Sequence, residues 1–251
     1  MSISSPERDA LQHKSALVVG VGGLGCPVAL ALVEAGIGRL VLCDDDLVDS
    51  TNLHRQILFD ESDVGTDKLE AAQRALYRSG ARPGSIELVH SRFLPENARD
   101  LARTVDVVIE GADNFATKFL CADACFLEQR PVVHGAAVRL RATVLCVAAA
   151  GAPCYRCLFE DLPSGPAAPN CADAGVLGPV VGFAGALMAD RALSLLLGNT
   201  HVFGNLVSFD GKDDRARELT LAARPHCALC SSERSITTIT FERYTAASCA
   251  A

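Results

Sequence analysis

Four side chains suited to binding a polyphosphate lie close together in the first third of the chain. Asn52, Arg55 and Gln56 fall within one short stretch, and Lys68 follows a dozen residues later. Arg55 offers a planar fork of donors, the two amides offer further donors, and Lys68 offers a point charge. An oxidoreductase that binds a dinucleotide has no use for such a cationic cluster. The set therefore favours a triphosphate as the ligand.

A glycine-rich turn lies upstream of these side chains. Gly20, Gly22 and Gly25 have the spacing G-x-G-x-x-G, and Gly23 lies between them. Such glycines permit a tight turn, let the backbone approach a phosphate and allow a helix to pack closely on a strand. Asp44, about 20 residues further on, is placed to accept hydrogen bonds from ribose hydroxyls. The turn and the acid predict a nucleotide site; a glycine turn without a ligand is the alternative.

A strand, a helix and a second strand must position these groups. Residues 16–19 are an apolar run typical of a buried parallel strand, 26–35 a helix, and 39–43 a strand that ends before Asp44. The remaining pattern predicts further elements, with strands over 85–90, 105–109, 131–134, 142–149, 206–210 and 218–221 and helices over 66–78, 95–103, 114–127 and 185–198. We expect an α/β fold with a Rossmann-like, mostly parallel sheet and an antiparallel C-terminal extension.

An acidic residue follows another predicted strand. The strand over 105–109 leads into Glu110-Gly111-Ala112-Asp113-Asn114. Ligands bind beyond the carboxyl ends of the strands in an open α/β sheet, so Asp113 belongs to the same rim as Asp44. A carboxylate would repel a triphosphate unless a cation lies between them, and Mg²⁺ accepts carboxylate and phosphate oxygens together. We predict Asp113 to be a magnesium ligand; its alternative role is the N-cap of the helix over 114–127.

Two cysteine pairs carry a second kind of chemistry. Cys154 and Cys157 form one C-x-x-C motif, and Cys227 and Cys230 form another. Together they predict a tetrahedral Cys₄ zinc site, which is structural because four thiolates leave no open position. About 70 residues separate the pairs, so the fold must bring them together. Redox dithiols and unrelated buried cysteines are the alternatives.

Cys171 stands apart from both pairs. It follows a segment over 162–170 that is rich in Pro, Gly and Ala and is predicted to be a mobile loop. A cysteine at the end of such a loop is a candidate nucleophile, against the alternative of a small buried residue. A further set, all within predicted elements, is expected to be core residues: Cys26, Cys43, Cys121, Cys125, Cys146 and His134.

Composition limits the possible partners. The chain of 251 residues has a net charge of −7 and no basic stripe, which argues against nucleic-acid binding. Its first residues contain no apolar signal segment, so we expect a cytoplasmic protein with reduced thiols. Asp190 and Arg191 interrupt the apolar stretch over 178–198, which indicates a buried helix rather than a membrane span. We expect one domain over 1–230 and a partly disordered tail over 231–251.

Several motifs together resemble the ThiF/MoeB/HesA family, relatives of ubiquitin-activating enzymes. The matching pieces cover nearly the whole chain: GVGGLG (20–25), CDDDLVDSTNLHRQ (43–56), Lys68, GADN (111–114), CYRC (154–157), NCADAGVLGPVVG (170–182) and CALC (227–230). SFDGKDD (208–214) and RQILF (55–59) are most similar to the thiamine-pathway member, ThiF.

The resemblance implies an adenylyltransferase that uses Mg-ATP. Such an enzyme activates the C-terminal glycine of a ubiquitin-like sulfur carrier ending in Gly-Gly and releases pyrophosphate, for thiamine or molybdopterin biosynthesis. It implies a sulfur donor protein (a desulfurase or a rhodanese) and a homodimer. The resemblance also implies that Gly23 and Asp44 hold the nucleotide and that the cysteine pairs bind zinc. The resemblance further assigns Asn52, Arg55 and Lys68 to phosphates, Asp113 to Mg²⁺ and Cys171 to a covalent link with the carrier.

One family feature has no match. Family members usually begin with an Arg-Tyr-x-Arg-Gln-type segment before the first strand, and Arg8 does not occupy that position. A catalytically weak carrier-binding subunit is therefore one alternative. An NAD-dependent oxidoreductase, suggested by the glycine spacing alone, is the other.

Overall fold

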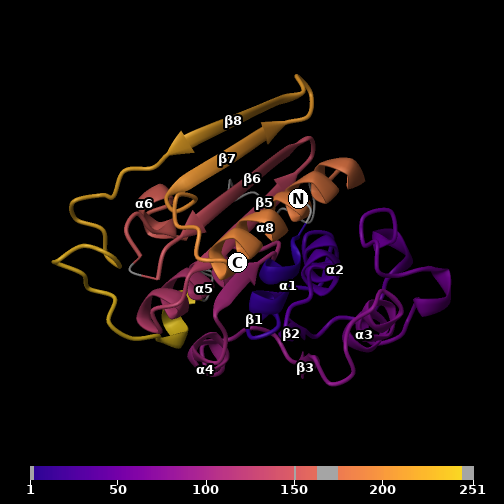
Figure 1. Cartoon of the computed structure of the whole chain (residues 1–251). Helices are drawn as coiled ribbons and strands as arrows, with labels where there is room; N and C mark the ends of the chain where they lie inside the picture. The colour runs from indigo at the N-terminus through magenta and orange to yellow at the C-terminus, as the bar shows by residue number, and fades with distance from the viewer. Residues whose placement is uncertain (1–2, 150, 163–174, 245–251) are drawn as a thin grey trace.

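The predicted first strand forms β1 (Ser15–Val19), which lies inside an eight-stranded sheet (Figure 1). This computed structural model describes residues 3–149, 151–162 and 175–244. The strand order is β3-β2-β1-β4-β5-β6-β7-β8. The first five of these are parallel: β3 (Ile86–His90), β2 (Arg39–Asp44), β1, β4 (Val107–Glu110) and β5 (Val132–Val138). The rest pair antiparallel, as predicted: β6 (Arg141–Val147), β7 (Asn205–Asp210) and β8 (Arg215–Thr220).

Helices cover both faces of the sheet because successive strand residues point to opposite faces. Val18 and Leu42 pack in one core and Leu17 and Val41 in the other. The first core is covered by α2 (Gly25–Ala35), α3 (Lys68–Arg78) and α8 (Gly178–Leu196), with α1 (Ser5–Leu11) beside α2. The second is covered by α4 (Ala98–Arg103), α5 (Phe115–Leu127) and α6 (Tyr155–Leu158). Short 3₁₀ turns are η1 (Ser50–Asn52), η2 (Glu61–Asp63) and η3 (Phe241–Tyr244).

The long helix α8 starts seven residues before its predicted start at residue 185. Proline is tolerated in a first helical turn, so the Gly-Pro pair at its beginning does not delay it. By length and composition alone α8 could cross a membrane, yet it packs against α2 and β5, and 56% of its apolar window is buried. Its Arg191 pairs with Glu218 of β8. The prediction of a buried helix is confirmed.

Part of the chain after Cys230 packs against the domain. Ile236 and Tyr244 are buried in the second core, and the Tyr244 hydroxyl donates to Asp123 of α5 over 2.7 Å. An apolar side chain and a buried hydroxyl with a partner hold this stretch against the domain as far as residue 244. Residues 245–251 lie outside the described ranges.

Strand β1 lies between β2 and β4, and this order creates the site. The Gly20 N–H donates to Cys43 O at the end of β2, and the Gly111 N–H donates to Val19 O at the end of β1. The segments that follow β1, β2 and β4 therefore meet at one edge of the sheet. This is the topological switch point at which open α/β sheets bind ligands.

Candidate functional site

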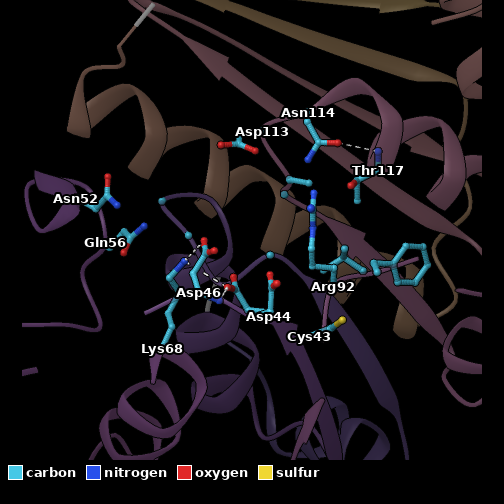
Figure 2. Close-up of a pocket in the computed structure, with 18 of the residues that line it drawn as sticks. Cys43, Asp44, Asp46, Asn52, Gln56, Lys68, Arg92, Asp113, Asn114 and Thr117 are labelled. Atoms are coloured by element: carbon cyan, nitrogen blue, oxygen red, sulfur yellow. Dashed lines mark hydrogen bonds and ion pairs between the residues drawn. The ribbon is translucent and has the colours of Figure 1, made fainter. Parts of the chain in front are cut away.

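A cavity of about 490 Å³ opens at this edge (Figure 2). It brings together every residue predicted to bind the nucleotide except Gly25, which is the first residue of α2. The lining includes Gly20, Gly22, Gly23, Asp44, Asn52, Arg55, Gln56, Lys68 and Asp113.

Two glycines of the turn are required by geometry. Gly20 has φ +83°, a left-handed conformation that glycine adopts without strain. A Cβ on Gly25 would collide with the carbonyl oxygen of Gly20, so α2 can start directly against the turn only with glycine there. The Gly23 N–H has no protein acceptor within the described ranges. The turn therefore presents a backbone donor and the start of α2 to the cavity, which suits an anion.

Asp44 is held firmly at the end of β2. Its Oδ2 accepts from Val21 N–H at 2.7 Å, and its Oδ1 accepts from Asp46 N–H at 3.0 Å. Each carboxylate oxygen has two lone-pair sites, so the group can still accept from a ligand hydroxyl. The acid is thus oriented before any ligand binds.

Lys68 is buried at the start of α3. Its Nζ lies 3.3 Å from Asp44 Oδ1 and 2.8 Å from Asp46 Oδ2. Burial acts to lower the pKa of Lys68, but the two aspartates outweigh it and raise that pKa above its usual value. Lys68 therefore stays charged, and carboxylates already balance its charge.

Arg55 has a different environment. Its Nη2 donates to Asn52 Oδ1 at 2.6 Å, and its Nη1 lies 3.3 Å from His54 Nε2. It has no carboxylate partner within the part of the chain described. Gln56 is buried beside the turn, and its Oε1 has no hydrogen-bond partner there. Arg55 is thus a cation positioned by a neighbouring amide and open to an anion.

Asp113 faces the cavity from the far side of the glycine turn (Figure 2). The alternative that Asp113 caps α5 is wrong, because Asn114 does so: its Oδ1 accepts from Thr117 N–H at 2.9 Å. Among the described residues, no group hydrogen-bonds to or pairs with the Asp113 carboxylate. It is therefore free to meet a cation in the cavity.

Sequence reasoning missed several side chains of the cavity, three of which lie on its β3 and α5 side. Arg92, Asn114 and Thr117 line it, and Arg92 extends between Asp44 and Asn114 (Figure 2). The Arg92 guanidinium has no partner within the described ranges. Arg92 follows the end of β3, so the strand-end argument applied to Asp44 and Asp113 could have found it.

The four cysteines of the two C-x-x-C motifs converge as predicted. The Sγ–Sγ distances are 3.5 Å for Cys154 and Cys227, 3.4 Å for Cys157 and Cys230, and 3.9 Å within the first pair. Sulfurs bound to zinc at about 2.3 Å lie about 3.8 Å apart in a regular tetrahedron. A disulfide needs an S–S distance of about 2.05 Å. The cluster therefore fits a tetrahedral metal ion, and the alternative of unrelated cysteines is wrong.

A buried ion pair anchors this cluster to the domain. Arg156, inside the first motif, donates to both carboxylate oxygens of Asp123 at 2.7 and 2.8 Å. Tyr244 donates to the same carboxylate, which is fully buried. Asp123 belongs to α5, so one helix supports the cysteine cluster and, at its other end, the Asp113 turn.

The remaining cysteines that the structure describes are core residues. As predicted, the thiols of Cys26, Cys43, Cys121, Cys125 and Cys146 are all buried. Cys43 touches the cavity, but burial, aided by Asp44 and Asp45, raises its pKa to about 12, so it stays protonated. The predicted nucleophile Cys171, most of the loop before it and Cys249 lie outside the described residues.

Comparisons with known proteins agree with this geometry. The sequence model of the ThiF family matches residues 1–231. The chain is 43% identical over 229 residues to "Adenylyltransferase and sulfurtransferase MOCS3" of Anopheles gambiae, and 42% identical over 231 residues to the protein of that name in Aedes aegypti. Each alignment covers 90% of this chain and 52% of the relative. The chain thus spans about half the length of these curated relatives.

Solved structures share the fold. The structure of E. coli MccB with ATP has a TM-score of 0.76 and 22% identity, over 89% of this chain and 69% of that one. The microcin C7 biosynthetic enzyme MccB in complex with N-formylated MccA has a TM-score of 0.77 and 22% identity, over 90% and 70%.

Proposed function

This chain belongs to the ThiF family, and we propose that it uses ATP to adenylate the C-terminal glycine of a small ubiquitin-like sulfur carrier. One observation carries the proposal. The glycine turn, the open cation Arg55 and the unpaired carboxylate of Asp113 all line one cavity at the switch point of the sheet. Two findings support it: the curated relatives are named as adenylyltransferases, and one similar solved structure is that of MccB with ATP.

The proposed reaction needs little proton transfer. The ionised carboxylate of the carrier attacks the α-phosphorus of ATP, and the bond to the β-phosphate oxygen breaks. Pyrophosphate leaves with the electron pair, and the product is an acyl adenylate, a mixed anhydride with a good leaving group. The protein must then position two anions and stabilise charge on the phosphates. A cavity with cations and backbone donors but few proton shuttles suits this chemistry.

Each residue predicted to bind the nucleotide has a part in this proposal. The Asp44 carboxylate accepts hydrogen bonds from the ribose, and the turn from Gly20 to Gly25 approaches the phosphates. Asn52, Arg55 and Gln56 donate to phosphate oxygens, and Lys68 adds its charge as it exchanges carboxylate partners for phosphate. The unpaired Asp113 carboxylate fits a magnesium ligand. A bound Mg²⁺ would neutralise phosphate charge at this point.

The remaining assignments are proposals of the same kind. The cysteine cluster holds a structural zinc ion that joins the C-terminal part of the domain to the start of α6. Cys171 is the residue that forms a covalent link with the carrier, and the sulfur comes from a donor protein, a desulfurase or a rhodanese. The carrier serves thiamine or molybdopterin biosynthesis, and the domain over 1–230 works as a homodimer.

ATP–pyrophosphate exchange with a carrier ending in Gly-Gly tests the proposal. We expect exchange that depends on the carrier and on Mg²⁺, and that collapses in Asp113→Asn. Asp213→Asn, in the exposed turn between β7 and β8, is the matched control and keeps wild-type exchange. Failure to bind ATP in the presence of Mg²⁺ would overturn the proposal. Carrier binding without exchange would indicate the carrier-binding subunit instead.

A further inference from the structure

A charged cluster lies buried directly behind the Asp113 turn. Glu110 ends β4, Lys118 belongs to α5 and His134 belongs to β5; they are 0%, 4% and 3% exposed. The adenylation chemistry proposed above uses none of the three. Burying charge is costly, and a buried ion pair is often no more stabilising than apolar residues of the same size. The cluster therefore needs an explanation other than fold stability.

The Glu110 carboxylate joins three elements of the domain. Its Oε1 accepts from Ala112 N–H at 2.7 Å and from Lys118 Nζ at 3.1 Å. Its Oε2 accepts from Lys118 Nζ at 3.0 Å and from His134 Nδ1 at 3.1 Å. Lys118 also donates to Gly135 O at 2.5 Å. The Lys118 ammonium is thus committed to protein acceptors rather than to a ligand.

The charges in the cluster are fixed. Burial acts to raise the pKa of Glu110, but Lys118 and His134 outweigh it and hold that pKa below its usual value. Burial lowers the pKa of His134, so its ring stays neutral and donates from Nδ1 to Glu110. The Tyr155 ring covers the His134 ring with centroids 4.6 Å apart. One anion and one cation therefore balance each other beside a neutral imidazole.

The consequence for Asp113 follows from its neighbours. Ala112, immediately before it, is held through its N–H by the Glu110 carboxylate. Asn114, immediately after it, is fixed by capping α5. The Asp113 carboxylate has no hydrogen-bond or ion-pair partner among the described residues, so its direction depends on these two anchors. Lys118 adds a third constraint, because it ties the first turns of α5 to the same carboxylate.

We propose that Glu110, Lys118 and His134 are positioning residues that hold the Asp113 carboxylate in the geometry needed to bind Mg²⁺ with the nucleotide. The inference rests on the proposed function, because it takes Asp113 as the magnesium-binding carboxylate. The groups that orient a metal-binding carboxylate set its metal affinity, whereas the glycine turn and Asp44 bind the rest of the nucleotide. The cluster should therefore control the Mg²⁺ requirement rather than ATP affinity as such.

The test measures pyrophosphate exchange against Mg²⁺ concentration, together with ATP binding in EDTA. Glu110→Gln should raise the Mg²⁺ concentration for half-maximal exchange about tenfold or more. High Mg²⁺ should restore exchange, and the affinity for ATP in EDTA should stay within about twofold of wild type. Lys118→Arg, which keeps the charge, should give the smaller shift.

Two further variants separate positioning from folding. Glu110→Gln/Lys118→Met leaves no unpaired buried charge, and we expect the same Mg²⁺ shift if Glu110→Gln alone fails to fold. Asp123→Asn breaks a pair equally buried in α5 but remote from Asp113. It should lower thermal stability and leave the Mg²⁺ requirement unchanged.

The outcomes distinguish a failure of the positioning role from a failure of the proposed function. An unchanged Mg²⁺ requirement in the folded variants overturns the inference, as does an equal loss of ATP affinity in EDTA. If Asp113→Asn retains full exchange, the magnesium assignment in the proposed function fails instead.

Discussion

Lys68 and Asp44, which the chain separates by 24 positions, form a buried ion pair with Nζ 3.3 Å from Oδ1. The pair joins the start of α3 to the end of β2 in the wall of the cavity. The lysine predicted to bind phosphate and the acid predicted to bind ribose are therefore already paired with each other in the absence of ATP. Asp46 contacts the same ammonium, so Lys68 can keep one carboxylate partner when it turns toward a phosphate.

Replacing Lys68 tests this unit. Lys68→Met leaves two carboxylates facing the phosphates without their cation, so we expect the KM for ATP in exchange to rise. A charge-assisted hydrogen bond contributes about 1.5–3 kcal/mol, which corresponds to a rise of roughly 10- to 100-fold. Arg74→Met, on the same helix and paired with Asp63 away from the cavity, should leave KM unchanged. An unchanged KM for ATP in Lys68→Met would show that Lys68 does not contribute to nucleotide binding.

Arg92 is expected to contribute to nucleotide binding. Its guanidinium extends into the cavity without a partner in the described part of the chain, so it can contact a ligand at no cost in broken ion pairs. Arg92→Ala should weaken ATP binding about tenfold by calorimetry. Arg141→Ala, an exposed arginine paired with Asp210 on the antiparallel strands, is the control. Equal affinities for the two variants would contradict a role for Arg92.

The cysteine cluster makes a prediction about metal content. Freshly purified, reduced protein should contain about one zinc ion per chain by elemental analysis. Cys227→Ser should lose the metal and lower Tm, because a structural metal contributes directly to folding. Cys146→Ala, which removes a buried thiol outside the cluster, should retain the zinc. Absence of zinc from the wild-type protein would rule out this site.

Stability should fall on mild acidification because of His134. In the unfolded chain this side chain takes up a proton near pH 6.5, whereas burial lowers its pKa in the folded protein. Below pH 6.5 the unfolded state thus binds more protons, so the free energy of unfolding decreases as pH falls. Glu110 also lowers the free energy of unfolding as the pH falls, but only below about pH 4.5, because its pKa in the folded protein is lowered as well.

Urea unfolding at pH 7.5 and 5.5 measures this effect. The wild-type protein should lose about 1 kcal/mol between the two, and His134→Gln should lose less. The exposed His201→Gln is the control and should behave as wild type. An identical pH dependence in His134→Gln would assign the acid sensitivity to other groups.

Local patterns were enough to predict the parallel half of the sheet and the convergence of the cysteines. The spacing of Gly20, Gly22 and Gly25 dictates a strand–turn–helix unit, and the antiparallel end follows from alternating strands. What could not be predicted depends on side-chain direction across the sheet edge. The Glu110–His134 contact exists only because β4 and β5 pair in the observed register, and Arg92 enters the cavity only because β3 lies beside β2.

The sequence also could not show which of two adjacent residues caps α5. Asp113 and Asn114 are both good helix caps by type, and a shift of one residue decides which of them caps α5 and which faces the cavity.

The distance along the chain between the parts of the protein sets the order in which they can be completed during synthesis. The described residues that line the nucleotide cavity lie between Val19 and Thr117. The cysteine cluster joins partners 73 residues apart and needs Cys230, near the end of the described chain. A nascent chain therefore contains these cavity residues well before it contains all four cysteines of the cluster. A metal ion held by all four thiolates can therefore bind only after the segment that forms the cavity has been synthesised.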